Sequence, residues 1–291
     1  MLEPMLVLTA GSPLHAALAA LAAAARVIVV TGLPGTGKSL LIHQLAQLAH
    51  ATGRRISLLQ WDVARPVVEA SPAARAFPAT HGVTHAMVRV AVGGWARGAI
   101  AAWDSERPAG ALLIVEAPLV GHRLVELARP MADAAEPLLS GSRTRFIVPV
   151  PSRALRAHLE AERGRRARAP QHPREREDAP PDVLRDLWRQ LARLAAALGL
   201  AALPPASDDV PYDPAIYAAV YGHVLCRRHV EVLTMDAVLP TSALSPYDFG
   251  IPVEDLRPTP DETPGLLDAA MREWGDPKAL AVAVERWYVT P

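Results

Sequence analysis

The chain has 291 residues, 51% of them hydrophobic, which allows one large domain or two small ones and excludes a chain that is disordered throughout. Thirty basic and thirty acidic residues give a formal net charge of zero, which argues against a nucleic acid or a membrane surface as the main partner. The single cysteine, Cys226, cannot form an internal disulfide or a cysteine metal cluster, so we expect a reducing, cytoplasmic location.

An alanine-rich segment precedes the first predicted strand. Residues 16–25 are apolar, but no Lys or Arg comes before them and Arg26 interrupts the run. A signal peptide needs a basic start, and a membrane span needs roughly 18 apolar residues. We therefore expect a helix here that leads into the first strand, and no targeting or membrane-spanning segment.

The most specific pattern follows a short β-branched run. Residues 27–30 (VIVV) predict a buried parallel strand, and residues 38–50 carry apolar residues at helical spacing. Between them, residues 32–39 (GLPGTGKS) match G-x-x-x-x-G-K-[ST] in full, a pattern whose backbone N–H groups surround phosphates at the start of a helix. Lys38 is expected to reach the β- and γ-phosphate oxygens, and Ser39 to coordinate Mg²⁺. The predicted nucleotide-binding residues are Gly32, Pro34, Gly35, Thr36, Gly37, Lys38, Ser39 and Leu40.

Apolar runs and helical patterns alternate along the rest of the chain. Strands are predicted at residues 56–61, 111–115, 145–150 and 229–235, and helices at residues 82–103, 153–166 and 182–198. This alternation predicts a three-layer α/β domain, with a parallel sheet of about five strands flanked by helices. We assign residues 1–240 to this domain. The proline-punctuated residues 241–291 are expected to form a C-terminal appendage packed on it.

Acidic side chains follow two of the predicted strands, where ligands bind in parallel sheets. Asp62 comes directly after the second strand, and Glu116 ends the third. A carboxylate at either point can accept a hydroxyl proton or organise Mg²⁺. The alternatives are a helix N-cap for Asp62 and a solvated strand end for Glu116. The segment PLVGHR after Glu116 predicts a surface loop, although His122 and Arg123 could instead line a substrate pocket.

The segment GLPGTGKS, with its flanking strand and helix, resembles the phosphate loop of the P-loop NTPase superfamily. Over residues 26–240, the order of elements and the strand-end residues are similar to the nucleoside and nucleotide kinase group. The guanine-reading Asn-Lys-x-Asp sequence is absent, and so is the Leu-Ser-Gly-Gly-Gln signature of ABC ATPases. Glu116 is a single carboxylate, unlike the Asp-Glu pair of AAA-type motors. The resemblance therefore implies ATP as the nucleotide and a kinase instead of a motor or switch.

This resemblance implies Mg²⁺-dependent transfer of a phosphoryl group from ATP to a small-molecule acceptor. It implies that Lys38 acts on the donor phosphates, that Ser39 and Glu116 hold Mg²⁺, and that Asp62 is catalytic. The acceptor would contact Asp62, Arg65 and Glu116. A lid over residues 153–180 would supply two further catalytic residues, Arg156 and Arg163.

Other readings of the same residues stay open. The arginine-rich segment also fits a solvated helix face with i,i+4 ion pairs, or a patch that binds nucleic acid. For the whole chain, the alternative is a P-loop ATPase or a nucleotide-dependent regulator that binds a protein or nucleic-acid partner. The identity of the acceptor is left open by the sequence, and so is the oligomeric state, including a homo-oligomer.

Overall fold

The structure, a computed structural model, describes residues 5–80, 82–202, 210–241 and 245–289. Six strands form one sheet in the order β5-β4-β1-β3-β2-β6, and every neighbouring pair is parallel. In chain order the strands are β1 (Val27–Thr31), β2 (Ile56–Gln60), β3 (Leu112–Ala117), β4 (Thr144–Pro151), β5 (Val230–Met235) and β6 (Glu254–Leu256). The predicted parallel α/β sheet is confirmed, with one strand more than expected.

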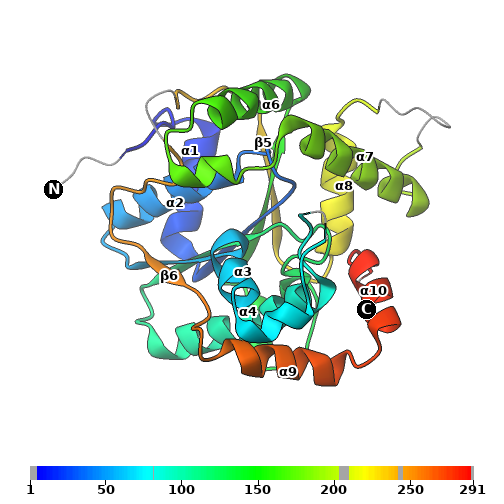
Figure 1. The fold of residues 1–291 in the computed structure, drawn as a ribbon. Helices are drawn as coiled ribbons and strands as arrows, with labels where there is room; N and C mark the ends of the chain where they lie inside the picture. Colours follow the sequence, from blue (N-terminus) through cyan, green and yellow to red (C-terminus); the bar gives the residue numbers. More distant parts are fainter. Residues whose placement is uncertain (1–4, 81, 203–209, 242–244, 290–291) are drawn as a thin grey trace.

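Helices cover both faces of this sheet (Figure 1). The longer ones are α1 (Pro13–Ala24), α2 (Lys38–Ala51), α3 (Trp61–Glu69), α4 (Ala86–Glu106), α6 (Arg153–Arg168), α7 (Pro181–Ala197), α8 (Pro214–Val224), α9 (Thr263–Glu273) and α10 (Pro277–Glu285). The connections contain short helical turns: η1 (Pro72–Ala76), η2 (Val125–Leu127), α5 (Glu136–Leu139) and η3 (Pro173–Arg176). None of the described helices is both long and apolar enough to cross a membrane.

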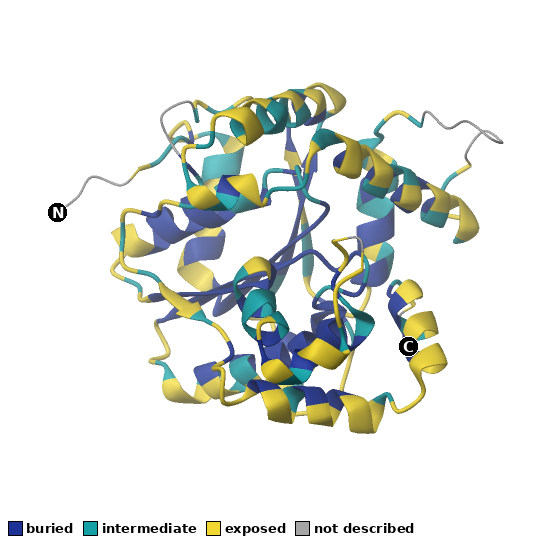
Figure 2. Cartoon of the chain, in the orientation of Figure 1, coloured by how far each residue is buried: buried dark blue, intermediate teal, exposed yellow. Residues whose placement is uncertain are grey.

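Alternating side chains of the central strand divide the core in two. Val27 and Val29 of β1 pack in one apolar cluster with residues of α4, α7, α8 and α9. Ile28 and Val30 pack in the other, with residues of α1 and α2. All four side chains are fully buried, because helices remove both faces of the sheet from water. Figure 2 shows the result as dark blue strands beneath helices whose outer sides are exposed.

Residues 245–289 contribute to the same sheet and to its cover. β6 pairs with β2 from Ser57↔Glu254 to Leu59↔Leu256 and forms one edge of the sheet. α9 packs along α4 on the outside of the molecule (Figure 1). The polar strand Glu254–Leu256 has too few residues for a periodic pattern, so the sequence did not predict it.

The helix expected from residue 82 begins later, at Ala86. Before the helix, Thr80 and Val83 form a short antiparallel bridge with each other. His85 then caps α4, because its Nδ1 accepts a hydrogen bond of 3.1 Å from the Met87 N–H. The bridge between Thr80 and Val83 is made by backbone atoms and has no signature in the spacing of apolar residues. The apolar spacing alone therefore predicted a helix start that is too early.

The register of the central strands brings the predicted functional residues to one edge. Glu116 of β3 lies beside Val30 of β1 on one side and beside Gln60 of β2 on the other. The phosphate loop follows β1, and α3 follows β2 without a connecting loop. The loop, Asp62 and Glu116 therefore meet at the carboxyl ends of three adjacent strands.

Candidate functional site

The phosphate loop folds as its glycines require. Gly35 and Gly37 have φ values of 73° and 87°, in the left-handed region that favours glycine. Gly37 is also the N-cap of α2, so no side chain competes for the first N–H groups of that 14-residue helix. These N–H groups and the positive end of the helix fit the phosphate chain of a nucleotide.

Lys38 and Glu116 face each other behind this loop. Lys38 is 6% exposed; its Nζ donates to Leu33 O at 3.1 Å and lies 3.5 Å from Glu116 Oε1. Burial lowers the pKa of the Lys38 ammonium, whereas the nearby carboxylates of Glu116 and Asp62 raise it. Burial also raises the pKa of the Glu116 carboxyl, which Lys38 opposes. Together with Ser39, which lines the same cavity, these groups fit the phosphates and Mg²⁺ of a bound nucleotide.

A tyrosine of α8 holds the start of the phosphate loop. The Tyr217 hydroxyl is fully buried and accepts a hydrogen bond of 3.1 Å from the Leu33 N–H. Burial raises the pKa of Tyr217 to about 12, so the hydroxyl stays protonated. A Cβ at Gly32 would lie 2.3 Å from this oxygen, which explains the glycine. One turn later, the Tyr221 hydroxyl donates to Pro118 O at 3.0 Å and holds the loop after β3.

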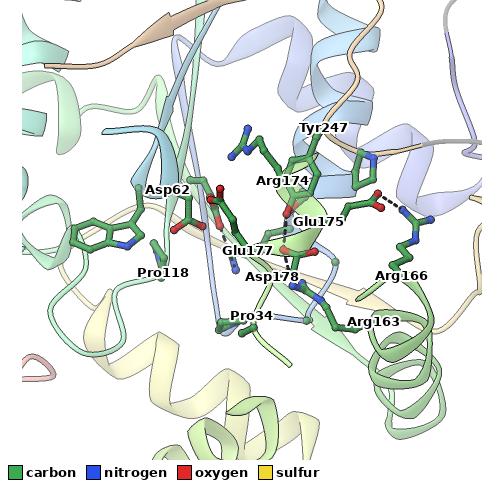
Figure 3. Close-up of a pocket in the computed structure, with 18 of the residues that line it drawn as sticks. Pro34, Asp62, Pro118, Arg163, Arg166, Arg174, Glu175, Glu177, Asp178 and Tyr247 are labelled. Atoms are coloured by element: carbon green, nitrogen blue, oxygen red, sulfur yellow. Dashed lines mark hydrogen bonds and ion pairs between the residues drawn. The ribbon is translucent and has the colours of Figure 1, made fainter. Parts of the chain in front are cut away.

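Asp62 lies in the first turn of α3 and lines the cavity beside the loop. The N-cap of α3 is Gln60, so Asp62 is not the capping residue. Its carboxylate is exposed and forms no hydrogen bond or ion pair with another described residue. In Figure 3 its side chain points into the cavity, on the opposite side from Arg163 and Tyr247. Arg65, one turn further along α3, also lines the cavity and pairs with Glu69 at 2.5 Å.

The arginines of α6 have two different environments. Arg156 is 2% exposed; it pairs with Glu160 at 2.8 Å and donates to Pro34 O at 3.0 Å. It therefore supports the backbone of the phosphate loop from outside the cavity. Arg163 lines the cavity itself and pairs with Asp178 at 2.6 Å.

Two segments beyond α6 form the wall opposite Asp62 (Figure 3). Asp178 precedes α7 and accepts a hydrogen bond of 2.7 Å from the Tyr247 hydroxyl. Burial raises the pKa of both the Asp178 carboxyl and the Tyr247 hydroxyl, and Tyr247 and Ser39 line the same cavity. Arg174 donates to Gln60 Oε1 at 3.0 Å and stacks over the Tyr247 ring at 4.6 Å. Part of the arginine-rich segment thus forms a wall of the cavity beside the phosphate loop.

These groups line a cavity of about 380 Å³ that is open to solvent on one side. That volume suits a small molecule or the phosphate end of a nucleotide. Three predicted site residues, Lys38, Asp62 and Glu116, line it together. Arg65 and Arg163 do so as well, whereas Arg156 is not among its lining residues.

The main expectation from the sequence did not place several residues at this site. Tyr217 and Tyr221 are four residues apart in α8, and no sequence pattern connects them with the phosphate loop. Arg123 was expected on a surface loop, but it lines the cavity, and its neighbour His122 is 1% exposed. Tyr247 enters from the C-terminal segment, which no pattern connected with the loop. Only the tertiary fold brings Tyr247 close to the phosphate loop.

Comparison with known proteins gives one match. Residues 8–71 match the family described as methylmalonyl Co-A mutase-associated GTPase MeaB. The matched part, less than a quarter of the chain, contains α1, β1, the phosphate loop, α2, β2 and α3. No curated protein and no solved structure matches the chain. With the sheet and loop described above, the match supports a P-loop NTPase domain that binds a nucleotide. It backs the alternative expectation, a nucleotide-dependent regulator, better than it backs a kinase.

Proposed function

We propose that the protein transfers the terminal phosphoryl group of a Mg²⁺-bound nucleoside triphosphate to a small acceptor that binds beside Asp62. The observation that carries this proposal is the open cavity that joins the phosphate loop to the Asp62 carboxylate. Lys38 and Asp62 lie on its wall together, and Asp62 makes no hydrogen bond or ion pair with the described residues. A carboxylate at this position is within the same cavity as the phosphate loop, where a proton acceptor for a second substrate would be required.

Each residue has a role that its environment allows. Lys38 and the N–H groups at the start of α2 bind the donor phosphates. Asp62 accepts the proton of the acceptor hydroxyl while the hydroxyl oxygen bonds to the terminal phosphorus. The bond from that phosphorus to the β,γ-bridging oxygen breaks, and the nucleoside diphosphate leaves. Arg163 stabilises charge on the transferred group once it exchanges its contact with Asp178 for the phosphate.

Ser39 and Glu116 are placed to hold Mg²⁺, which would neutralise charge on the phosphates. Tyr247 and Arg174 cover this region and exclude water, which would otherwise compete with the acceptor. The nucleotide base has no assigned contacts. ATP and GTP are therefore both candidates, although the sequence lacks Asn-Lys-x-Asp.

The family match supports a second candidate, a nucleotide-dependent regulator that hydrolyses GTP with a protein partner. The name of that family describes GTPases associated with methylmalonyl-CoA mutase. In this reading the cavity binds nucleotide alone, and Asp62 orients water or stabilises the first turn of α3. A mutase of that type is the first partner to test.

The experiment measures release of ADP from Mg²⁺-ATP and of GDP from Mg²⁺-GTP. Each nucleotide is supplied alone, with pooled nucleosides, nucleoside monophosphates, sugars and hydroxy acids, and with a purified mutase. Lys38→Ala is the control for turnover at the phosphate loop. Asp62→Asn keeps the size of the side chain and removes the proton acceptor.

The two candidates give different results. Transfer predicts release that rises with one acceptor pool and falls by about 100-fold or more in Asp62→Asn, while nucleotide affinity changes little. Partner-dependent hydrolysis predicts release that ignores every pool, rises with the partner and persists in Asp62→Asn. The second result would refute the transfer proposal.

A further inference from the structure

The Asp62 end of the cavity contains an arginine that the proposed function has not used. Arg123 follows β3 and lines the cavity with Trp61, Asp62 and Arg65. Its guanidinium donates to Val120 O at 3.2 Å. Among the described residues, no carboxylate lies within ion-pairing distance of Arg123.

Of the five buried arginines among the described residues, four have such partners and Arg89 does not. Arg26 pairs with Asp104, and Arg156 with Glu160, each at 2.8 Å. Arg97 pairs with Asp133 and Glu136. A guanidinium taken from water needs an anion to compensate its charge, so a partly buried arginine without one has room for an anionic ligand.

Neighbouring charges make this end of the cavity more positive. A Cβ at Gly121 would lie 3.5 Å from a guanidinium nitrogen of Arg123 and 3.6 Å from one of Arg89, so the two side chains come close together. Arg89 is 9% exposed and uses its donors on Thr84 O and Gly121 O. Burial and Arg123 together lower the pKa of Arg89 to about 10. Burial lowers the pKa of the Arg123 guanidinium. The negative charge of Asp62 raises this pKa, and the positive charge of Arg65 lowers it further.

The loop that carries Arg123 is firmly held in an unusual conformation. Leu119, His122 and Leu124 have φ values of 61°, 60° and 62°, which non-glycine residues rarely adopt. The backbone of Leu119 bonds in both directions with that of Arg123. His122 Nε2 lies 2.7 Å from Glu126 Oε1 beneath the loop. Such strained backbone persists where surrounding contacts hold it, and it often serves to present a functional side chain.

We propose that Arg123, assisted by Arg65, binds an oxyanion of the second substrate at the Asp62 end of the cavity. The substrate class is then a small hydroxyl compound that carries a carboxylate or a phosphate. A guanidinium suits both groups because it can donate two parallel hydrogen bonds. The anion orients the substrate, and Asp62, on the same wall, faces its hydroxyl. This inference rests on the proposed transfer function.

The test measures binding, so that it does not depend on turnover. The full chain is saturated with a non-hydrolysable Mg²⁺-nucleotide and titrated calorimetrically with matched pairs of probes. The pairs are adenosine and cytidine against their 5′-monophosphates, and glycerol against glycerate and glycerol 3-phosphate. The variants are Arg123→Gln and Arg123→Lys, and Arg272→Gln on the exposed side of α9 is the matched control.

We expect at least one anionic probe to bind the wild type more tightly than its neutral counterpart. Whether that probe carries a carboxylate or a phosphate identifies the group. Arg123→Gln should weaken its binding by about 10- to 100-fold, as expected for the loss of hydrogen bonds from a charged group. Arg123→Lys should weaken it less, and Arg272→Gln should leave it unchanged.

Three results would overturn the inference: no anionic probe binds at millimolar concentration, neutral and anionic partners bind equally, or Arg123→Gln binds as the wild type does. Failure of the transfer function is recognised separately, because release of ADP or GDP would then be stimulated by none of the acceptor pools. Circular dichroism of Arg123→Gln, with intact nucleotide binding, checks that the variant is folded.

Discussion

Replacing Tyr217 with phenylalanine is expected to destabilise the protein through its phosphate loop. The hydroxyl is fully buried and accepts a 3.1 Å hydrogen bond from the Leu33 N–H. Phenylalanine keeps the ring and its apolar contacts, but it leaves this N–H without a partner. An unpaired buried donor costs about 1–3 kcal/mol, so the free energy of unfolding should fall by about that amount.

A double-mutant cycle that combines Gly32→Ala with Tyr217→Phe tests the contact between this hydroxyl and residue 32. A Cβ at Gly32 would lie 2.3 Å from the Tyr217 oxygen, so Gly32→Ala alone forces the two groups apart. In a Tyr217→Phe background that oxygen is missing, whereas the backbone strain of an alanine at φ +141° is the same in both backgrounds. The two substitutions together should therefore cost less than the sum of the single costs, by about 0.5–3 kcal/mol.

Urea unfolding of the four proteins, followed by circular dichroism, measures the cycle. Tyr288→Phe is the control, because no described hydrogen bond involves that hydroxyl, and it should change the free energy of unfolding by less than about 0.5 kcal/mol. Strictly additive costs for Gly32→Ala and Tyr217→Phe would refute the assignment of Tyr217 as the contact that restricts residue 32. Nucleotide affinity provides a second readout, since a displaced loop should bind phosphates more weakly.

Two further predictions concern carboxylates. Although burial opposes it, hydrogen bonds from Arg228 and Arg97 lower the pKa of Glu136 to about 2. Its contribution to the free energy of unfolding is therefore complete above the ordinary glutamate pKa and is lost as the pH falls from there towards about 2. Acid titration of the unfolding free energy should show this loss in the wild type and not in Glu136→Gln, and identical profiles would contradict it. Asp178→Asn should tighten Mg²⁺-nucleotide binding several-fold, because it removes a buried negative charge from the cavity and frees Arg163. Calorimetric titration that finds weaker or unchanged binding would disprove that role, with Asp186→Asn on the exposed face of α7 as the control.

The sequence predicted the parts of the site that follow strands directly. The chain GLPGTGKS has to form a phosphate loop, since its glycines, its lysine and its position before a helix all act locally. Asp62 and Glu116 were placed by one topological rule, that parallel strands end at the same edge. The structure brings both to that edge beside Lys38.

Residues brought in by loops and by distant segments could not be predicted in the same way. Arg123 reaches the cavity because three non-glycine residues of its loop adopt left-handed conformations, and no sequence pattern specifies these. Arg156 and Arg163 are equivalent in a charge pattern, yet packing of α6 buries the first under the loop and leaves the second at the cavity. Tyr247 depends on how residues 245–249 cross the sheet edge, a contact far apart in sequence.

The position of the sixth strand near the end of the chain determines the order in which parts of the protein can fold during synthesis. Synthesis proceeds from the N-terminus, so β2 remains an unpaired edge until Glu254–Leu256 leave the ribosome and pair with it. Tyr247 is synthesised just before this strand, and it lines the cavity together with Ser39. A nascent chain can thus form the phosphate loop early, but the wall that contains Tyr247 is added only near the end of synthesis. The complete binding cavity is therefore absent from the earlier folding intermediates.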